Sequence, residues 1–594
     1  MVVLKDLAKN TLKWLFSVQA ALKQEKTNGK CVLGTPNAPK LPGFLNNNPL
    51  PNGFPWGPLT ADGTNYYKQW PNTGVTRKYD FTVSRGVIAP DGYERKVLLV
   101  NGAYPGPTIE SNWGDWIEVT VHNNITDVPE GTALHWHGFR QQNTQWEDGV
   151  PSISQCPIAP GKTYTYRFQA TLYGTSWYHS HYSSQYAGGL LGPMVVYGPN
   201  KASHDIDLGP VILSDWYHKQ YYDIIKEILT VGGNGLTFSD NNLINGKGNF
   251  NCSTVAAGDN TKCTNNAGIS KFKFQTGKTH RLRLINSGAE GTQRFSIDGH
   301  TLTVIANDFV EVEPYDTKVV TLGIGQRTDI LVKANVGNSK SAFWMRSNLT
   351  SCSLANQPLA LAAIYYDQAD QNQAPTSSAW NVPDPGTCTN DDLALTKPVM
   401  KLKPSTPAVT KIMEIKVFRN DSGIIQWSLD GEDFRGDFNN PTLLQANKGN
   451  LTFDADWNVD NFANNGSIRV IVTNNSPAAH PMHLHGYNMY ILAEGDGLTW
   501  DGTITNPENP QRRDVQQVRA GGHLVMQFDS SENPGTWPFH CHIAWHSSAG
   551  LFAQFLVQSD KVRRFQIPAK VQQTCKEWSE YTSRNIPDVI DSGL

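Results

Sequence analysis

The sequence predicts an all-β protein made of several sandwich or barrel domains. Short segments alternate apolar and polar residues, as at 116–121, 281–285 and 467–472. The 51 glycines and 35 prolines break the chain between such segments, and helical periodicity is scarce. With 594 residues, the chain is long enough for about three to four domains of ordinary size.

An internal repeat relates two distant parts of the chain. Residues 174–181 (Gly-Thr-Ser-Trp-Tyr-His-Ser-His) resemble residues 535–542 (Gly-Thr-Trp-Pro-Phe-His-Cys-His), and His-Trp-His-Gly at 135–138 resembles His-Leu-His-Gly at 483–486. We therefore predict that the first and third domains are copies of one unit. The middle part of the sequence, around 203–372, contains no comparable pair of closely spaced histidines.

His540, Cys541 and His542 predict two different metal sites on the two sides of one strand. Successive side chains of a strand point to opposite faces, so the histidines face one way and Cys541 the other. The same spacing sorts the other clusters by face, although a bend expected at Pro481 weakens the argument for His480. One site then receives eight histidines: His135, His137, His179, His181, His483, His485, His540 and His542.

The second predicted site contains His480, Cys541 and His546. Two imidazoles and a thiolate are the ligands of blue copper, and eight imidazoles suit three metal ions better than one. A single His-x-His pair is more often a pair of satisfied polar side chains. Four clusters that hold ten of the 16 histidines, one of them with Cys in its centre, favour metal binding.

The four stretches resemble the signatures of the multicopper oxidase family: His-Trp-His-Gly, His-Ser-His, His-Pro-Met-His-Leu-His-Gly and His-Cys-His-Ile-Ala-Trp-His. The surrounding sequence is similar to an ascomycete fungal laccase, over residues 75–562 and at the last four residues. This resemblance implies three tandem cupredoxin-like Greek-key β-sandwich domains, with a trinuclear copper site between the first and the third. It also implies four copper ions as cofactors: one type 1, one type 2 and two type 3.

The resemblance also implies a ligand set for each copper. Type 1 copper would take His480, Cys541 and His546, with Leu551 as its axial neighbour. Type 2 copper would take His135 and His483. The two type 3 coppers would take His137, His179 and His542, and His181, His485 and His540.

Leu551 is predicted to tune the type 1 site. Blue-copper sites often carry a weak axial Met, whose thioether stabilises Cu(II), whereas Leu donates no electron density. We therefore expect a comparatively high reduction potential. As an alternative that is compatible with this role, Leu551 is a core residue of the apolar run 551–553.

The expected domain organisation follows the repeat and the resemblance. Residues 1–74 are expected to form a leader and an irregular extension, and 563–594 a C-terminal tail. The units between them are a first cupredoxin domain (75–202), a second without copper ligands (203–372), a linker (373–404) and a third with the type 1 site (405–562).

Two carboxylates are candidates for moving protons. Asp148 is similar to the family's acidic residue near type 2 copper, or it is simply a turn-forming Asp before Gly149. Glu290 matches the acidic position in the substrate pocket of fungal laccases, where it would accept the proton of a phenol; otherwise it is an ordinary loop residue. Ala544 stands where other multicopper oxidases carry an acidic residue, so no carboxylate relay is expected there.

The two ends of the chain and its cysteines bear on the compartment. The last residues, Asp591, Ser592, Gly593 and Leu594, resemble the plug of ascomycete laccases in the channel to the trinuclear site.

The resemblance also suggests the disulfides Cys156–Cys575 and Cys352–Cys388. A third pair, between Cys252 and Cys263, would close a short loop, and Cys31 would then have no partner. Seven Asn-x-Ser/Thr sequons favour secretion and glycosylation: Asn124, Asn251, Asn348, Asn420, Asn450, Asn465 and Asn474.

The N-terminal residues are expected to form a leader, although their sequence is atypical for one. Residues 1–26 have a Lys-bearing start, but their apolar stretch at 15–22 is short. A mis-annotated start and an amphipathic helix are the alternatives.

Composition narrows the range of partners. A net charge of −3 and 17% charged residues give no sign of nucleic acid or an anionic membrane as a partner. No uninterrupted apolar run approaches the roughly 18–20 residues of a membrane span. We expect a monomer, with an oligomer left open, whose partners are phenolic small molecules and dioxygen.

The predicted function is that of a laccase: one-electron oxidation of phenols at type 1 copper, coupled to four-electron reduction of dioxygen to two waters. The alternatives are a ferroxidase or other metallo-oxidase, an ascorbate oxidase and a pigment-pathway phenol oxidase. A non-catalytic copper-binding protein would lack ligands, yet this chain has the complete set. Lignin fragments, melanin precursors and plant phenols all fit as reductants.

Overall fold

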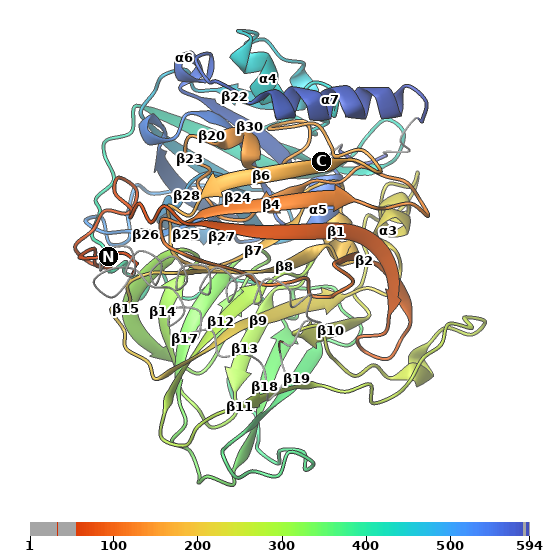
Figure 1. Ribbon diagram of the computed structural model, residues 1–594, viewed down its shortest axis with the longest axis vertical. Helices are drawn as coiled ribbons and strands as arrows, with labels where there is room; N and C mark the ends of the chain where they lie inside the picture. Colours follow the sequence, from red (N-terminus) through yellow and green to blue (C-terminus); the bar gives the residue numbers. More distant parts are fainter. Residues whose placement is uncertain (1–32, 34–54, 586–589, 593–594) are drawn as a thin grey trace, which may run out of the picture.

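The computed structural model (Figure 1) describes residues 33, 55–585 and 590–592. Its chain is mostly β-strand, and six sheets follow one another along the sequence in three pairs. This confirms the predicted all-β class. Cys31 and the expected leader lie outside the described residues.

The first pair of sheets has the strand orders β2-β1-β4-β6 and β3-β8-β7-β5. Burial alternates along β4 and β6, because one face of their sheet packs on the core and the other meets water. Every residue of β7 is buried. The strands are β1 (Thr76–Ile88), β2 (Arg95–Val100), β3 (Ile109–Asn112), β4 (Trp116–Asn123), β5 (Leu134–Trp136), β6 (Thr163–Gln169), β7 (Gly174–Ser180) and β8 (Leu191–Tyr197).

The second pair has the strand orders β10-β9-β12-β17-β14-β15 and β11-β19-β18-β13-β16. Helix α3 (Tyr221–Ile228) follows β9 and lies near the helix that carries His546. The strands are β9 (Ile206–Trp216), β10 (Asn241–Ile244), β11 (Ser270–Lys273), β12 (Thr279–Asn286), β13 (Gln293–Ile297), β14 (Leu302–Asn307), β15 (Val310–Thr317), β16 (Val320–Leu322), β17 (Arg327–Lys333), β18 (Ala342–Leu349) and β19 (Leu359–Tyr365).

The third pair has the strand orders β21-β20-β23-β28-β25-β26 and β22-β30-β29-β24-β27. The strands are β20 (Val409–Arg419), β21 (Ile425–Leu429), β22 (Val459–Asn461), β23 (Ser467–Asn474), β24 (His480–Leu484), β25 (Met489–Asp496), β26 (Gln511–Arg513), β27 (Val515–Val518), β28 (Gly522–Asp529), β29 (Gly535–Cys541) and β30 (Phe552–Val557). Its helices are α4 (Thr442–Asn447), α5 (Ala544–Ser548), α6 (Ser559–Val562) and, in the tail, α7 (Ala569–Thr582).

Strand β24 runs through Pro481 without a break, and Pro481 pairs with Gln517 of β27. The bend expected at this proline therefore does not interrupt the strand. His480 and His483, three residues apart, accordingly lie on opposite faces, as the spacing predicted.

The first and third parts share one continuous apolar core. Trp136 and Trp177 of the first part belong to the same cluster of buried side chains as Met482 and Phe539 of the third. The middle part has most of its buried side chains in a core of its own. Figure 1 shows the green strands of the middle part below the orange and blue strands of the other two. Each of the three proposed cupredoxin domains contains one pair of sheets, and the boundaries at 202, 372 and 404 remain our proposal.

The described cysteines other than Cys541 form three disulfides. Cys156–Cys575 fixes α7 of the tail to the first part of the chain, across 419 residues. Cys352–Cys388 and Cys252–Cys263 close shorter loops. All three expected pairings are confirmed.

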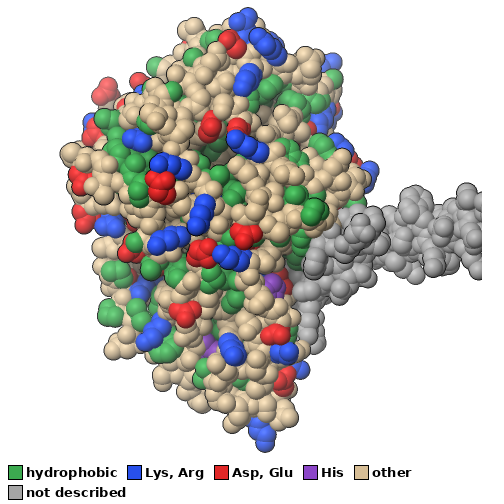
Figure 2. All heavy atoms as spheres, turned by 90° about the vertical axis from the view of Figure 1, so that its left-hand side faces the viewer, with side chains coloured by type: hydrophobic (Ala, Val, Ile, Leu, Met, Phe, Trp, Pro, Cys, Tyr) green, Lys and Arg blue, Asp and Glu red, His purple; other side chains and the backbone are tan. Residues whose placement is uncertain are grey.

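The surface carries both signs of charge. On the face in Figure 2, basic and acidic side chains are interspersed rather than gathered into one patch. Among the described residues, no helix is long and apolar enough to cross a bilayer. Asn474 is fully buried, so its sequon is closed to glycosylation in the folded protein.

Candidate copper centres

Cys541, His480 and His546 converge on one point. Sγ of Cys541 lies 3.4 Å from Nδ1 of His480 and 3.8 Å from Nδ1 of His546, and these two nitrogens are 3.1 Å apart. The centre of this triangle is about 2 Å from each atom, which is the length of metal–nitrogen and metal–sulfur bonds. The three side chains therefore fit the trigonal ligand set of blue copper.

Burial sets the protonation of these ligands. It raises the pKa of the Cys541 thiol and lowers the pKa of His546 to about 3. Burial also lowers the pKa of His480, whose Nε2 lies 2.9 Å from Oγ of Ser476, so that Nδ1 is left for a metal. A thiolate at this depth needs a cation beside it. Only His546 of the three is partly exposed, and the ring of Trp427 lies 4.2 Å from its ring.

Leu551 is tied to this centre through the backbone. Its amide donates to the carbonyl of His546 at 3.0 Å, and its own carbonyl accepts from the amide of Cys541 at 3.2 Å. Its side chain is fully buried. The axial role of Leu551 stays a prediction.

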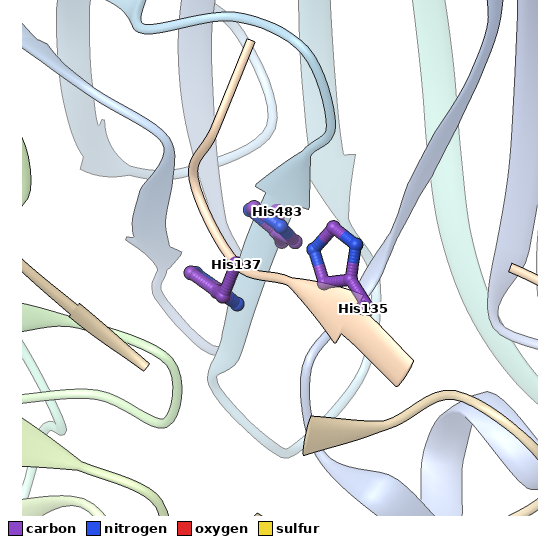
Figure 3. Close-up of side chains that lie close together, drawn as sticks. All are labelled: His135, His137 and His483. Carbon is purple, nitrogen blue, oxygen red and sulfur yellow. The ribbon is translucent and has the colours of Figure 1, made fainter. Parts of the chain in front are cut away.

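The eight other clustered histidines surround a second centre between the two repeated units. Cross-strand pairing sets His135 opposite His179, and His483 opposite His540. Figure 3 shows His135 and His137, from β5 and the residue after it, beside His483 of β24. The ring nitrogens form three groups whose members lie within 4.8 Å of one another: His135, His137 and His483; His137, His179 and His542; and His181, His485 and His540.

Each of these groups turns ring nitrogens toward a common space. Nε2 of His485 and Nε2 of His540 are 3.1 Å apart, and Nε2 of His542 is 3.3 Å from Nδ1 of His137. Burial lowers the pKa of these four rings, which keeps them neutral, the form that binds metal. Three further ring nitrogens that face this space have no hydrogen-bond partner within the described chain: Nε2 of His135, His179 and His483. Converging, unpartnered nitrogens fit metal ions.

The outward nitrogens of several rings are held by backbone carbonyls. These bonds fix each ring and leave its Nε2 facing the centre, as is usual for metal-binding histidines. The contacts run from Nδ1 of His135 to Asp148 (2.8 Å), of His179 to Ser180 (2.9 Å), of His483 to Asp514 (2.9 Å) and of His540 to Cys541 (2.8 Å).

Asp514 holds another ligand, and the sequence did not point to it. Its Oδ1 lies 3.0 Å from Nε2 of His137, and Arg327 donates to both carboxylate oxygens at 2.5 and 2.7 Å. Burial raises the pKa of Asp514 to about 6, against the opposing effect of Arg327. The signal in the sequence is the charged run Arg512-Arg513-Asp514 beside the apolar Val515. Only the fold reveals that its partner comes from β17.

The middle part also closes one side of the eight-histidine centre. Gly325 has a φ of +83°, and a Cβ at this position would lie 2.8 Å from Cδ2 of His542 and 3.1 Å from Cε1 of His137. Glycine alone fits both the backbone conformation and the space. Although it supplies none of the clustered ligands, the middle part therefore helps to shape the centre.

Asp148 faces the same centre from the end of a short 3-10 helix, η1 (Gln145–Glu147). Its Oδ2 lies 2.9 Å from Nδ1 of His485, and its Oδ1 is 3.3 Å from Nδ1 of His135. Asp148 is followed by Gly149, whose φ is +78°. The geometry is compatible with both interpretations from the sequence, because this Asp forms a turn and also contacts two of the clustered histidines; its proton-carrying role stays a prediction.

Glu290 lies on a loop that is bound to the helix of His546. The carboxylate of Asp215, at the end of β9, accepts hydrogen bonds from the amides of Ala289, Glu290 and Gly291 at 2.7, 2.8 and 2.6 Å. The carbonyl of Ala289 accepts from the amide of Ala544, the first residue of α5, at 2.8 Å. This chain of bonds fixes Glu290 relative to His546.

The carboxyl group of Glu290 is withdrawn from water although the residue is partly exposed. Burial raises its pKa well above the usual range, and the charge of Asp215 acts in the same direction. The hydroxyl of Tyr217 donates to Oε2 of Glu290 at 3.3 Å and accepts from the indole nitrogen of Trp545. Asp215 and Tyr217 are further residues of this site that the sequence did not point to.

The C-terminal tail returns to the eight-histidine centre. The hydroxyl of Ser183 donates to Asp591 at 2.6 Å, and the amide of Ser592 donates to the carbonyl of Ser548 at 2.8 Å. Ser183 and Ser548 line a small cavity together with His179, His181, His540 and His542. Gly593 and Leu594 lie outside the described residues, and the blocking role of the tail stays a prediction.

The comparisons with known proteins agree with this geometry. Three family models, each described as multicopper oxidase, match residues 82–201, 207–369 and 429–561. Oxidoreductase OpS5 of Beauveria bassiana is 39% identical over 89% of each chain, and laccase-2 of Botryotinia fuckeliana 37% over 91% of this chain and 92% of its own. The crystal structure of a laccase from Botrytis aclada matches with a TM-score of 0.83 and 34% identity, over 95% of this chain and all of that one.

The chain therefore belongs to the multicopper oxidase family. Within this family it is a laccase-type oxidase, with four copper ions as its cofactors. An oxidase of this type takes electrons from phenols and passes them to dioxygen.

The contact between Asp514 and His137 yields a first prediction. Replacing the carboxylate in Asp514→Ala leaves His137 without its acceptor and Arg327 without its anion. We expect copper affinity at the eight-histidine centre to fall about 10–100-fold, measured by competition with a chelator. Asp496→Ala, at an exposed carboxylate, is the control and should bind copper as the wild type does. Equal copper affinity in the Asp514 variant would contradict the role.

Proposed function

We propose that the two centres divide the work of a laccase, with electrons accepted at one and dioxygen reduced at the other. His480, Cys541 and His546 hold type 1 copper; His135 and His483 hold type 2. The type 3 pair is held by two groups of three: His137, His179 and His542, and His181, His485 and His540. Copper at these positions supplies reversible one-electron chemistry and a place for dioxygen. The observation that carries the proposal is the strand β29, which joins both ligand sets.

Cys541 and its two neighbours form the path between the centres. Cys541 faces the three-ligand site, while His540 and His542 face the eight-histidine site on the other side of β29. Consecutive residues give an unbroken covalent connection, so no gap through space has to be crossed. A substrate too large to reach the buried histidines can still deliver its electrons.

His546 is the proposed point of contact with the phenol. It is partly exposed, whereas His480 and Cys541 are fully buried. Glu290 accepts the proton as the electron leaves, which avoids a cationic radical of high energy. Phenols ionise near pH 10, so without such a base the substrate would keep its proton at neutral pH. Four phenols each lose one electron and one proton, and one dioxygen takes up all of them to form two waters.

Asp148 is the proposed proton carrier at the eight-histidine centre. Its Oδ1, 3.3 Å from Nδ1 of His135, makes no hydrogen bond within the described chain, so this oxygen can take up a proton. Oδ2 remains bound to His485 and keeps the carboxyl group in place. Because Ala544 has no carboxyl group, Asp148 is the better candidate of the two positions.

We also propose secretion as a glycosylated monomer. Three disulfides suit an oxidising compartment. Asn124, Asn251 and Asn450 carry sequons at exposed positions. The mass of the purified protein in solution, before and after removal of glycans, tests whether the protein is glycosylated and whether it is a monomer.

Oxygen uptake with three reductants tests the function itself. A diphenol, Fe(II) and ascorbate are compared at equal concentrations on copper-loaded protein. We expect the diphenol to give the highest kcat/KM, because Glu290 can receive its proton. A higher kcat/KM for Fe(II) would instead support a ferroxidase.

The role of Glu290 predicts different effects on two kinds of substrate. In Glu290→Gln, kcat/KM for a phenol should fall by about 10²-fold or more, whereas a reductant without an ionisable proton should change little. In the wild type, kcat/KM for the phenol should rise as the pH increases through the raised pKa of Glu290, since only the ionised form accepts a proton. The variant should lose this rise. Equal losses on both substrates would remove the role.

Leu551 predicts the direction of a potential shift. A thioether at this position would donate electron density and stabilise Cu(II), so Leu551→Met should lower the reduction potential of the type 1 site. Redox titration followed through the visible absorption measures the shift. An unchanged or higher potential would leave Leu551 with a packing role alone.

A further inference from the structure

A cluster of exposed apolar side chains follows helix α3. Val231, Leu236 and Phe238 are 67, 54 and 49% exposed, and no residue from 229 to 238 carries a charge. We call these three side chains the apolar rim. Single exposed apolar residues are ordinary, but three within eight residues are typical of a binding surface.

One end of this segment lies against the strand that covers His546. The amide of Gly232 donates to the carbonyl of Gly423, in the turn between β20 and β21, at 3.0 Å. A Cβ on Gly235 would lie 3.0 Å from Cγ2 of Ile425. Ile425 and Trp427 are two residues apart on β21 and so share a face. The ring of Trp427 in turn lies 4.2 Å from that of His546.

The other end of the segment leads to Glu290. The amide of Ser239, directly after Phe238, donates to the carbonyl of Leu354 at 3.0 Å. Oγ of Ser353, the residue before Leu354, accepts a hydrogen bond from the amide of Thr292, two residues after Glu290, at 3.0 Å. The segment that carries the apolar rim is therefore bound at one end next to the strand beside His546 and at the other end to the loop that contacts the Glu290 loop.

We propose that the apolar rim binds the second ring of a multi-ring phenol, so that the preferred substrates are bulky, uncharged polycyclic phenols. The inference rests on the proposed function, in which one ring lies between His546 and Glu290. A ring fused or linked to the first extends beyond those two residues and covers Leu236 and Phe238. Burial of these side chains against an apolar ring favours binding, and a phenol with a single ring offers less apolar surface to bury. Because residues 229–238 carry no positive charge, this segment would not attract an anionic polymer.

Steady-state kinetics with two probes test the inference. The probes are 2,6-dimethoxyphenol, with one ring, and a bisphenol, with two. In Leu236→Ser/Phe238→Ser the KM for the bisphenol should rise about tenfold, while the KM for dimethoxyphenol and both kcat values change less than twofold. Phe238→Trp, which enlarges the apolar surface, should lower the KM for the bisphenol. Ile412→Ser, at a side chain 61% exposed on β20, is the matched control and should alter neither KM.

The outcomes separate this inference from the function on which it rests. Equal changes of both KM values, or no change in either, would overturn the role of the apolar rim while phenol oxidation by the wild type stands. Failure of the wild type to oxidise either phenol would overturn the proposed function and the inference together. Selective loss of the bisphenol, with single-ring turnover intact, supports both.

Discussion

The arrangement of the protein depends on ring nitrogens that are buried together without hydrogen-bond partners. Leaving one such buried group unsatisfied costs about 1–3 kcal/mol, and three of these nitrogens, Nε2 of His135, His179 and His483, meet in the eight-histidine centre. Metal ions bound there would remove that cost, and they would also separate the converging nitrogen pairs His485–His540 and His137–His542, which are 3.1 and 3.3 Å apart. The sheets that carry these histidines share an apolar core, and bound metal ions would add a second link between them.

All three parts of the chain contribute to this centre. The first and third parts supply four histidines each, and their shared core brings the two sets together. The middle part adds Arg327, which holds Asp514, and Gly325, which leaves room for two rings. The middle part also carries Asp215, the carboxylate that binds the loop of Glu290. A part of the chain without clustered ligands thus positions groups at both centres.

Period-2 spacing was sufficient to predict which histidines share a site, because side-chain direction along a strand is a local property. It separated His480 from His483 correctly even across Pro481. Asp514, Asp215 and Tyr217 could not be predicted in this way, since each acts through residues far away in the sequence. The same holds for the apolar rim, because the exposure of Leu236 and Phe238 depends on the strands around them. The spacing in the sequence was therefore enough to predict which histidines lie together, whereas the residues that orient them could be identified only from the fold.

Copper content and visible absorption of Cys541→Ser, compared with the wild type, test the central claim most directly. The two-centre arrangement predicts four coppers and an intense blue thiolate-to-copper absorption in the wild type. It predicts three coppers and no blue absorption in the variant, because the eight histidines remain. Far fewer than four coppers in the wild type, or blue absorption that survives the loss of the sulfur, would contradict it.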